Sequence, residues 1–393
     1  MNGLELPPLS LYVHVPWCVR KCPYCDFNSY TLRENAPPER LYVDALLWDL
    51  EDELPLVQGR QLLSIFIGGG TPSLFSADAI KRLLEGIRAR VAWRDDIEIT
   101  LEANPGTVEH DRFSAYRAAG VNRLSLGIQS FADAQLRALG RIHSGSEALE
   151  AVTTARQAGF ENLNLDLMFN LPGQDLAASQ ADLAQAIALE PTHLSFYQLT
   201  LEPNTEFAAH PPALPDDDTA WAMQEAGIER LARHGYRQYE VSAYARTGSM
   251  SRHNRNYWEF GDYLAIGAGA HGKYTRPDRG EVWRRTRVRQ PRQYLADTDR
   301  RIGEDAPIAH DALAFEFFLN ALRLTEGFPR VLFPQRTGLA WTTLATQLAE
   351  ATADGLLEPD PTDRWVRPSA AGQRFLNNLI ERFLPDATPT PER

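Results

Sequence analysis

Three cysteines, Cys18, Cys22 and Cys25, lie within one short segment, and the rest of the chain has none. An odd and tightly spaced set cannot form a disulfide framework. A structural zinc site takes four protein ligands, and no cysteine supplies the fourth. His14 precedes the motif at an expected strand position, where a packed or solvated side chain is more typical than a ligand. The C-x3-C-x2-C spacing instead favours an iron–sulfur cubane whose three thiolates leave one iron open to a further ligand.

A second set of residues that could bind a ligand follows short apolar segments. Glycines allow a backbone to approach a bound ligand closely, because they carry no Cβ. A carboxylate at a strand end can accept hydrogen bonds from an ammonium group or a ribose hydroxyl. The residues concerned are Gly69, Gly70, Thr71, Glu102, Gln129, Arg141 and Asp166.

The elements that would position these residues alternate regularly. Short β-rich apolar segments predict strands at 11–15, 62–67, 97–102, 123–128, 162–168 and 193–199. Helical patterns lie between them at 41–53, 78–90, 111–119, 147–158 and 176–189. This rhythm indicates parallel strands joined by crossover helices. Six units are too few for a closed eight-stranded barrel, so an open, partial (β/α)6 barrel is expected, with the cysteines and the polar residues on the rim at its C-terminal strand ends.

The strand-and-helix rhythm stops after residue 245. We expect a barrel at 1–245, a connecting region at 246–305, a small mainly helical, winged-helix-like domain at 306–384 and a Pro/Thr-rich, disordered tail at 385–393. The C-terminal domain is expected to contain helices at 311–324, 344–354 and 370–383 and a short strand at 365–366.

Composition narrows the class of protein. The formal charge of -12 argues against an indiscriminate nucleic-acid binder, which needs a positive surface. No apolar run approaches the ~18 residues of a membrane span. The first ten residues contain no basic residue, unlike a signal peptide. A soluble, cytoplasmic protein is therefore expected.

The cysteine motif and its surroundings resemble the radical S-adenosylmethionine (SAM) superfamily. That resemblance implies a [4Fe-4S] cluster bound by Cys18, Cys22 and Cys25, with SAM on the open iron as the source of a 5′-deoxyadenosyl radical. Similarity to the oxygen-independent coproporphyrinogen oxidase branch implies SAM contacts from Tyr12, Tyr24, Gly69, Gly70, Thr71, Glu102, Gln129, Arg141 and Asp166.

Two branches with this layout differ at recognisable positions. The oxidases carry a fourth cysteine two residues after the third, where this chain has Phe27, and a long N-terminal arm, where only 17 residues precede Cys18. His253-Asn254-x-x-Tyr257-Trp258 matches the H-N-x-x-Y-W pattern of the HemW-type heme chaperones. The resemblance therefore favours a heme chaperone without coproporphyrinogen oxidase activity, and no catalytic residue is assigned. An oxidase acting on coproporphyrinogen III is the alternative, and a radical SAM enzyme with another substrate is a third hypothesis.

The resemblance also implies how heme would be bound and used. His253, Asn254, Tyr257 and Trp258 become heme-binding candidates, because imidazole ligates heme iron and aromatic rings pack on a macrocycle. His271 is a second candidate iron ligand. The segment 276–301 contains nine arginines and only four acidic residues. This excess of positive charge predicts either a solvated face or a clamp for heme propionates.

The expected partners are heme, recipient heme proteins of the respiratory chain that are membrane-bound, and a second copy of the chain, with no nucleic acid. Binding to such recipients would place the protein at the periphery of the inner membrane. Because the cluster and heme motifs lie on different segments, Cys18→Ala is expected to leave much of the heme binding intact.

Overall fold

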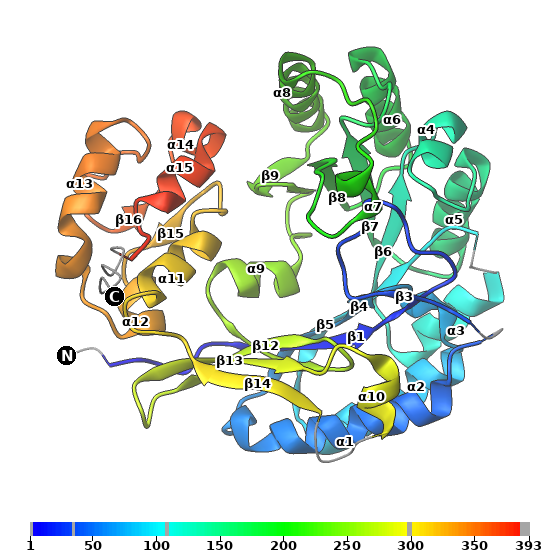
Figure 1. Ribbon diagram of the computed structural model, residues 1–393, viewed down its shortest axis with the longest axis horizontal. Coiled ribbons are helices and arrows are strands. Elements are labelled where there is room, and N and C mark those ends of the chain that lie inside the picture. The colour runs from blue at the N-terminus through cyan, green and yellow to red at the C-terminus, as the bar shows by residue number, and fades with distance from the viewer. Residues whose placement is uncertain (1–2, 34–35, 107–109, 297–300, 386–393) are drawn as a thin grey trace, which may run out of the picture.

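The structure is a computed structural model that describes residues 3–33, 36–106, 110–296 and 301–385. All but the first residue of the predicted tail lies outside this range. The chain forms an α/β fold in which a curved sheet is covered by helices on one side, with the C-terminal helices grouped beside it (Figure 1).

Six parallel strands form the core of the sheet, and each coincides with a predicted strand. Residues that point outward, such as Leu11 and Val13, pack under the helices and are fully buried. The strands are β1 (Leu9–Val15), β4 (Leu62–Gly69), β5 (Trp93–Ala103), β6 (Arg123–Gln129), β7 (Asn162–Phe169) and β8 (His193–Gln198). The predicted helices are α1 (Glu39–Val57), α2 (Ala77–Arg90), α3 (His110–Ala119), α5 (Gly145–Gln157) and α6 (Leu176–Ala188), and α4 (Asp133–Ala138), α7 (Glu206–Ala209) and α8 (Asp217–Arg233) accompany them.

The sheet is wider than the sequence predicts. On one edge it continues through β10 (Ala243–Ala245) and β9 (Arg237–Glu240), and on the other through β11 (Asp262–Ile266), β12 (His271–Arg276), β13 (Glu281–Arg287) and β14 (Ile302–Pro307). β11 pairs in parallel with β1, so part of the expected connecting region is a strand of the barrel wall. The helix before it, α9 (Arg252–Trp258), is too short to give a strand-and-helix signal.

The inner face of the barrel is polar and layered. The register aligns Ser10 with Ser64 and Ser64 with Glu98, and one layer higher it aligns Tyr12 with Phe66. Since alternate residues of a strand point to the same side, these side chains share the interior. The interior is thus built to hold polar groups, while the apolar core lies between the sheet and the helices.

The C-terminal region matches the predicted small helical, winged-helix-like domain. Its helices are α11 (Leu313–Ala321), α12 (Leu332–Thr337), α13 (Ala345–Ala353), α14 (Ala370–Arg374) and α15 (Leu376–Glu381), and β15 (Phe328–Pro329) pairs with β16 (Trp365–Val366). Its own core centres on Phe317 and Phe318, which are fully buried.

This C-terminal region bridges the two edges of the open sheet. At the β13 edge, Arg284 forms an ion pair with Glu316 of α11. At the β9 edge, Glu240 forms an isolated bridge with Leu324 and an ion pair with Arg323 at 3.2 Å. The sheet therefore does not close into a full barrel, but the C-terminal helices connect its two edges.

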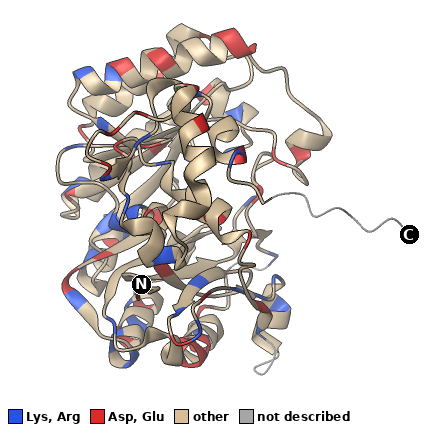
Figure 2. Cartoon of the chain, turned by 90° about the vertical axis from the view of Figure 1, so that its left-hand side faces the viewer, with Lys and Arg blue, Asp and Glu red and all other residues tan. Residues whose placement is uncertain are grey.

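Basic and acidic residues are interspersed along the chain as seen from the side of the C-terminal helices (Figure 2). No helix within the described residues is long and apolar enough to cross a membrane.

Candidate functional site

The three cysteines lie on the loop that follows β1. A short parallel pair of strands, β2 (Trp17–Cys18) and β3 (Tyr30–Thr31), closes the two ends of this loop. Its turn is closed by the backbone N–H of Cys25, which donates to the carbonyl of Cys22 at 3.1 Å. All three thiols line a rim pocket of about 320 Å³. Burial raises the pKa of the Cys18 and Cys25 thiols, so binding of a metal cluster there would release protons.

The donor set of the cysteine loop suits a cluster better than a single ion. Among the described residues, no group of three His, Cys, Asp or Glu side chains could hold one metal ion. In a cubane each thiolate binds a different iron, so the sulfurs stand farther apart than the ligands of one ion. The donor set, three thiols facing one polar pocket, fits a [4Fe-4S] cluster with one open iron.

The glycines after β4 bring the backbone against the cysteine loop. A Cβ on Gly70 would lie 2.4 Å from the carbonyl oxygen of Trp17, so no larger residue fits. The backbone N–H of Gly70 donates to Val15, and that of Thr71 donates to Trp17, each at 2.7 Å. These N–H groups are therefore used within the protein, and carbonyl oxygens are what the segment can offer to a ligand's ammonium group.

Glu102 lies at the end of β5, on the floor of the rim pocket. Its Oε2 accepts a hydrogen bond from the backbone N–H of Gly69 at 3.1 Å. Burial, and then the nearby Asp166 carboxylate, raise the pKa of Glu102 to about 8. Burial also raises the pKa of Asp166, which accepts hydrogen bonds from Ser125 and Asn164. The floor therefore carries two partly buried carboxyl groups that a positively charged ligand would favour in their ionised form.

Arg141 is directed inward, and its contacts exclude the surface ion pair that a lone arginine could form. Its Nη2 donates to Asn104 Oδ1 at 2.6 Å and to the carbonyl of Gly127 at 2.7 Å. Its Nη1 lies 3.7 Å from Cys22 Sγ. The guanidinium thus joins the cysteine loop to the ends of β5 and β6.

The structure brings nearly all predicted SAM residues to one pocket. Tyr24, Gly69, Gly70, Thr71, Glu102, Gln129, Arg141 and Asp166 line it together with the cysteines. Tyr12 is the exception, because this partly buried residue does not line the pocket. Ser195 and Tyr197 of β8 also line it and were not predicted, although polar residues at alternate positions of a strand were a usable signal. Tyr197 donates to Gln129 Oε1 at 2.8 Å.

The second motif forms the short helix α9, which lies inside the barrel against β1 and β4 (Figure 1). Glu98 of β5 caps its N-terminus by accepting hydrogen bonds from the backbone N–H groups of Arg252 and His253, each at 3.1 Å. His253 is 1% exposed, and its two ring nitrogens are hydrogen-bonded to Ser64 Oγ at 2.9 Å and Tyr257 OH at 2.8 Å.

The contacts of His253 are those of an interior histidine. Burial lowers the pKa of His253 to about 3, and Arg123 adds to the effect, so the ring is neutral. Its ring stacks on Phe66 at 5.0 Å. Tyr257 and Trp258 are partly buried, and the guanidinium of Arg323 lies over the Trp258 ring at 4.3 Å.

The two predicted sites meet inside the barrel. Tyr12 stacks on Phe66 at 6.2 Å and lies 6.5 Å from His253, measured between ring centroids. The hydroxyl of Tyr12 lies 2.9 Å from Nδ1 of His14, and a Cβ on Gly69 would lie 2.5 Å from that ring. Tyr12 of the predicted SAM set and His253 of the second motif are thus distant in sequence but adjacent in space. That heme binding survives loss of the cluster stays a prediction.

The arginine-rich segment is largely structural. Arg287 pairs with Asp49 and Glu53 of α1, each at 2.6 Å, and all three side chains are buried. Arg285 pairs with Glu53 and with Asp305. These ion pairs attach β13 to α1, so neither the solvated face nor the propionate clamp describes those arginines.

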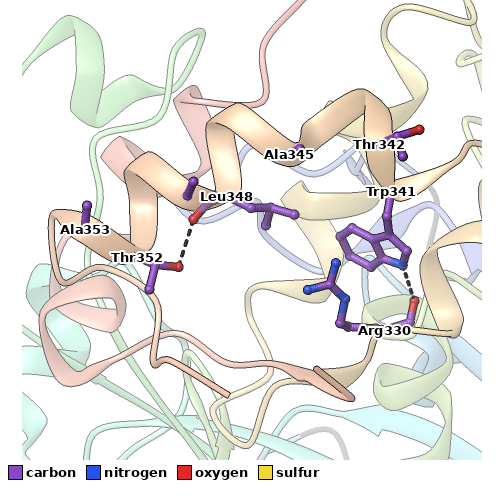
Figure 3. A pocket seen from close by; sticks show the side chains of 8 residues that line it. Arg330, Trp341, Thr342, Ala345, Leu348, Thr352 and Ala353 are labelled. Carbon is purple, nitrogen blue, oxygen red and sulfur yellow. Dashed lines mark hydrogen bonds between the residues drawn. The ribbon is translucent and has the colours of Figure 1, made fainter. Parts of the chain in front are cut away.

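The C-terminal helices carry a larger groove, of about 640 Å³, lined mainly by one face of α13 (Figure 3). Its polar groups are engaged locally: Trp341 Nε1 donates to the carbonyl of Arg330, and Thr352 donates to that of Leu348. Arg330 also stacks on Trp341 at 4.6 Å and pairs with Asp363. The groove presents no free titratable group and has no chemistry comparable to that of the rim pocket.

Comparison with known proteins agrees with this geometry. The Radical SAM superfamily model matches residues 12–181, and the HemN C-terminal domain model matches residues 308–375. The chain is 51% identical to the heme chaperone HemW of Escherichia coli over 97% of this chain and 99% of that protein. It is 41% identical to the mitochondrial radical S-adenosyl methionine domain-containing protein 1 of Mus musculus, over 96% and 87%.

Among solved structures, coproporphyrinogen III oxidase (HemN) from Escherichia coli is similar with a TM-score of 0.80. The match covers 96% of this chain and 90% of that one at 24% identity, so it confirms the fold and says nothing of the reaction.

Proposed function

The chain belongs to the HemW family of heme chaperones, and on that premise we propose that it binds heme and transfers it to heme proteins. The observation that carries this proposal is the full-length similarity to the Escherichia coli heme chaperone. Membership of the radical SAM superfamily implies a [4Fe-4S] cluster and SAM. Together they supply reductive, radical chemistry when bound. The residues of this chain hold, orient and shield them.

The rim pocket supports an assignment of roles to individual residues. Cys18, Cys22 and Cys25 would bind the cluster. Carbonyl oxygens near Gly70 and the carboxylate of Glu102 would accept hydrogen bonds from SAM, and Arg141 would secure the cysteine loop. The remaining contacts to SAM would come from Tyr24, Gly69, Thr71, Gln129 and Asp166. Tyr12 would act on this site through His14, which lies against Gly69.

The alternative, a coproporphyrinogen oxidase, is less well supported at the cluster loop. Phe27 stands where the resemblance places the oxidases' fourth cysteine, and its side chain is 60% exposed beside the thiols. A large apolar side chain cannot supply the polar or thiol chemistry of a cysteine there. An exposed aromatic ring does suit contact with a flat macrocycle.

The wider setting is also proposed from family membership. The recipients would be heme proteins of the respiratory chain, which would bring a cytoplasmic chaperone to the inner membrane through its partners. A homodimer would be one form of the protein. The family motif offers His253, Asn254, Tyr257 and Trp258 as candidates for the heme site, with His271 as a second candidate iron ligand.

Two assays on one preparation test this function. The protein is reconstituted anaerobically and titrated with hemin. In parallel it is incubated with coproporphyrinogen III, SAM and dithionite. We expect stoichiometric heme binding and no protoporphyrinogen. Robust decarboxylation without heme binding would overturn the proposal in favour of the oxidase.

A further inference from the structure

The histidines of the chain differ in whether a ring nitrogen is available to an iron. His14, His193 and His253 are buried, and both ring nitrogens of each are hydrogen-bonded. An iron bound by His253 in this arrangement would have to displace Ser64 or Tyr257 and enter the interior of the barrel. The histidine of the recognised motif is therefore poorly placed as a ligand.

His271 differs from these. It is the first residue of β12, it is exposed, and its side chain has no hydrogen-bond or ion-pair partner among the described residues. Partial burial, and then Arg289 and Arg284, lower the pKa of His271, so its imidazole is neutral near pH 7. A neutral imidazole with a free nitrogen is the form that binds iron.

The position of His271 is also specific, because the turn before β12 contacts the cysteine loop. The side-chain amide of Asn28 donates to the carbonyls of Ala268 and Arg289, each at 3.0 Å. A Cβ on Gly269 would lie 2.1 Å from that amide. His271 thus follows a turn that is packed directly on the loop of the cluster.

Two neighbours supply the other chemistry that a heme needs. Phe27 precedes Asn28 and exposes most of its ring, which can pack on a porphyrin face. Arg289 is exposed, and its guanidinium has no partner among the described residues, so it is free to pair with a propionate. The other arginines of this segment that reach Asp49 and Glu53 are already neutralised.

We propose that His271 is the protein ligand of the heme iron, with Phe27 against the porphyrin and Arg289 at a propionate. The site lies beside the cysteine loop, and the exposure of His271, Phe27 and Arg289 would leave a bound heme accessible to a recipient protein. This inference rests on the proposed function, because it names the ligand of the heme that a chaperone would carry. In it, α9 has a structural role, as the helix that fills the barrel beneath SAM.

Hemin titration of the anaerobically reconstituted protein tests the assignment, with absorption and paramagnetic resonance spectra of the ferric complex. His271→Ala should change the Soret band and the resonance spectrum and weaken binding about tenfold or more. Added imidazole should restore the original spectrum, because it replaces the lost ligand. His210→Ala is the matched control and should leave both measurements unchanged, because His210 is also exposed and its side chain has no partner in the described part of the chain.

His253→Ala separates the two histidines. We expect it to lower the thermal midpoint while leaving the spectrum of bound heme histidine-ligated. An unchanged spectrum in His271→Ala, or loss of the histidine signature in a folded His253→Ala protein, would overturn the proposal. Failure of the unmodified protein to bind hemin would instead contradict the proposed function itself.

Discussion

Glu102 is the carboxyl group of the rim pocket whose pKa is raised to about 8. Its carboxyl lies partly buried near Asp166, and its pKa of about 8 means that the unliganded protein holds a proton there at neutral pH. A bound cationic ligand would favour release of that proton. The residue is thus suited to respond to the positively charged SAM.

The raised pKa of Glu102 predicts a specific dependence of stability on pH. Between about pH 4.5 and 8 the folded protein holds a proton that the unfolded chain has released, so the free energy of unfolding falls as pH rises through this window. Glu102→Gln removes this effect. The variant should gain stability relative to the unmodified protein from pH 5 to 8, by at most about 1.4 kcal/mol per pH unit. The free energy of unfolding of both cluster-free proteins is measured by denaturant unfolding at several pH values. The same pH dependence in both proteins would contradict the assignment.

Each cysteine should be required for the cluster, because three thiolates leave no spare ligand. Replacement of Cys18, Cys22 or Cys25 by Ala should remove most bound iron and sulfide after reconstitution. Iron and sulfide analysis with the paramagnetic resonance of the reduced protein provides the readout. Four irons per chain in the triple variant would refute the site.

The position of a site residue could be predicted from the sequence where that residue lies at or just after the end of a strand. Glu102 and Asp166 could be predicted at the rim because parallel strands end at one edge of the barrel. His253 could not be predicted to be buried, because its partners Ser64 and Glu98 lie more than 150 residues away in the chain. Its environment is decided by long-range packing, which no local pattern records.

Helix α9 links the barrel interior to both predicted sites. It is capped by Glu98, and His253 connects it to β4. The short helix α9 and the strands after it were not predicted, because the usual alternation of apolar and polar residues is missing from β13. Arg285 and Arg287 are charged but face α1, where they pair with its acidic residues.

His253→Ala should destabilise the protein by about 2–4 kcal/mol at pH 7, since it leaves a cavity and two unpaired hydroxyl groups. Its low pKa sets the pH dependence. Between about pH 3 and 6.5 the unfolded chain binds a proton that the folded protein does not, so this contribution is present above pH 6.5 and is lost as pH falls. The difference between variant and unmodified protein should therefore shrink in acid. A difference that is constant with pH would contradict the neutral, buried ring.

The whole molecule is an open barrel spanned by its C-terminal helices. Phe317 of α11 holds these helices together. The distance between ring centroids is 5.5 Å to Phe260 and 5.2 Å to both Phe328 and Phe333. The helices themselves follow the predicted pattern. Their attachment to both edges of the sheet, through Glu316 and Glu240, depends on pairs that only the fold brings together.

Phe317→Ala should cost about 3–5 kcal/mol of stability, because it empties the centre of the C-terminal core. Leu319→Ala, on the same helix but 41% exposed, is the matched control and should cost no more than about 0.5 kcal/mol. Thermal unfolding compares the two. Equal losses would contradict the packing described for α11.

The central claim is that this chain carries heme to other proteins. The most direct measurement loads the reconstituted protein with hemin and mixes it with membrane vesicles that contain a heme-depleted respiratory enzyme. Recovery of that enzyme's activity is followed alongside capture of the heme by apomyoglobin. We predict that heme reaches the respiratory enzyme faster than it is lost to apomyoglobin. Equal or slower delivery, matching that of free hemin, would contradict the account.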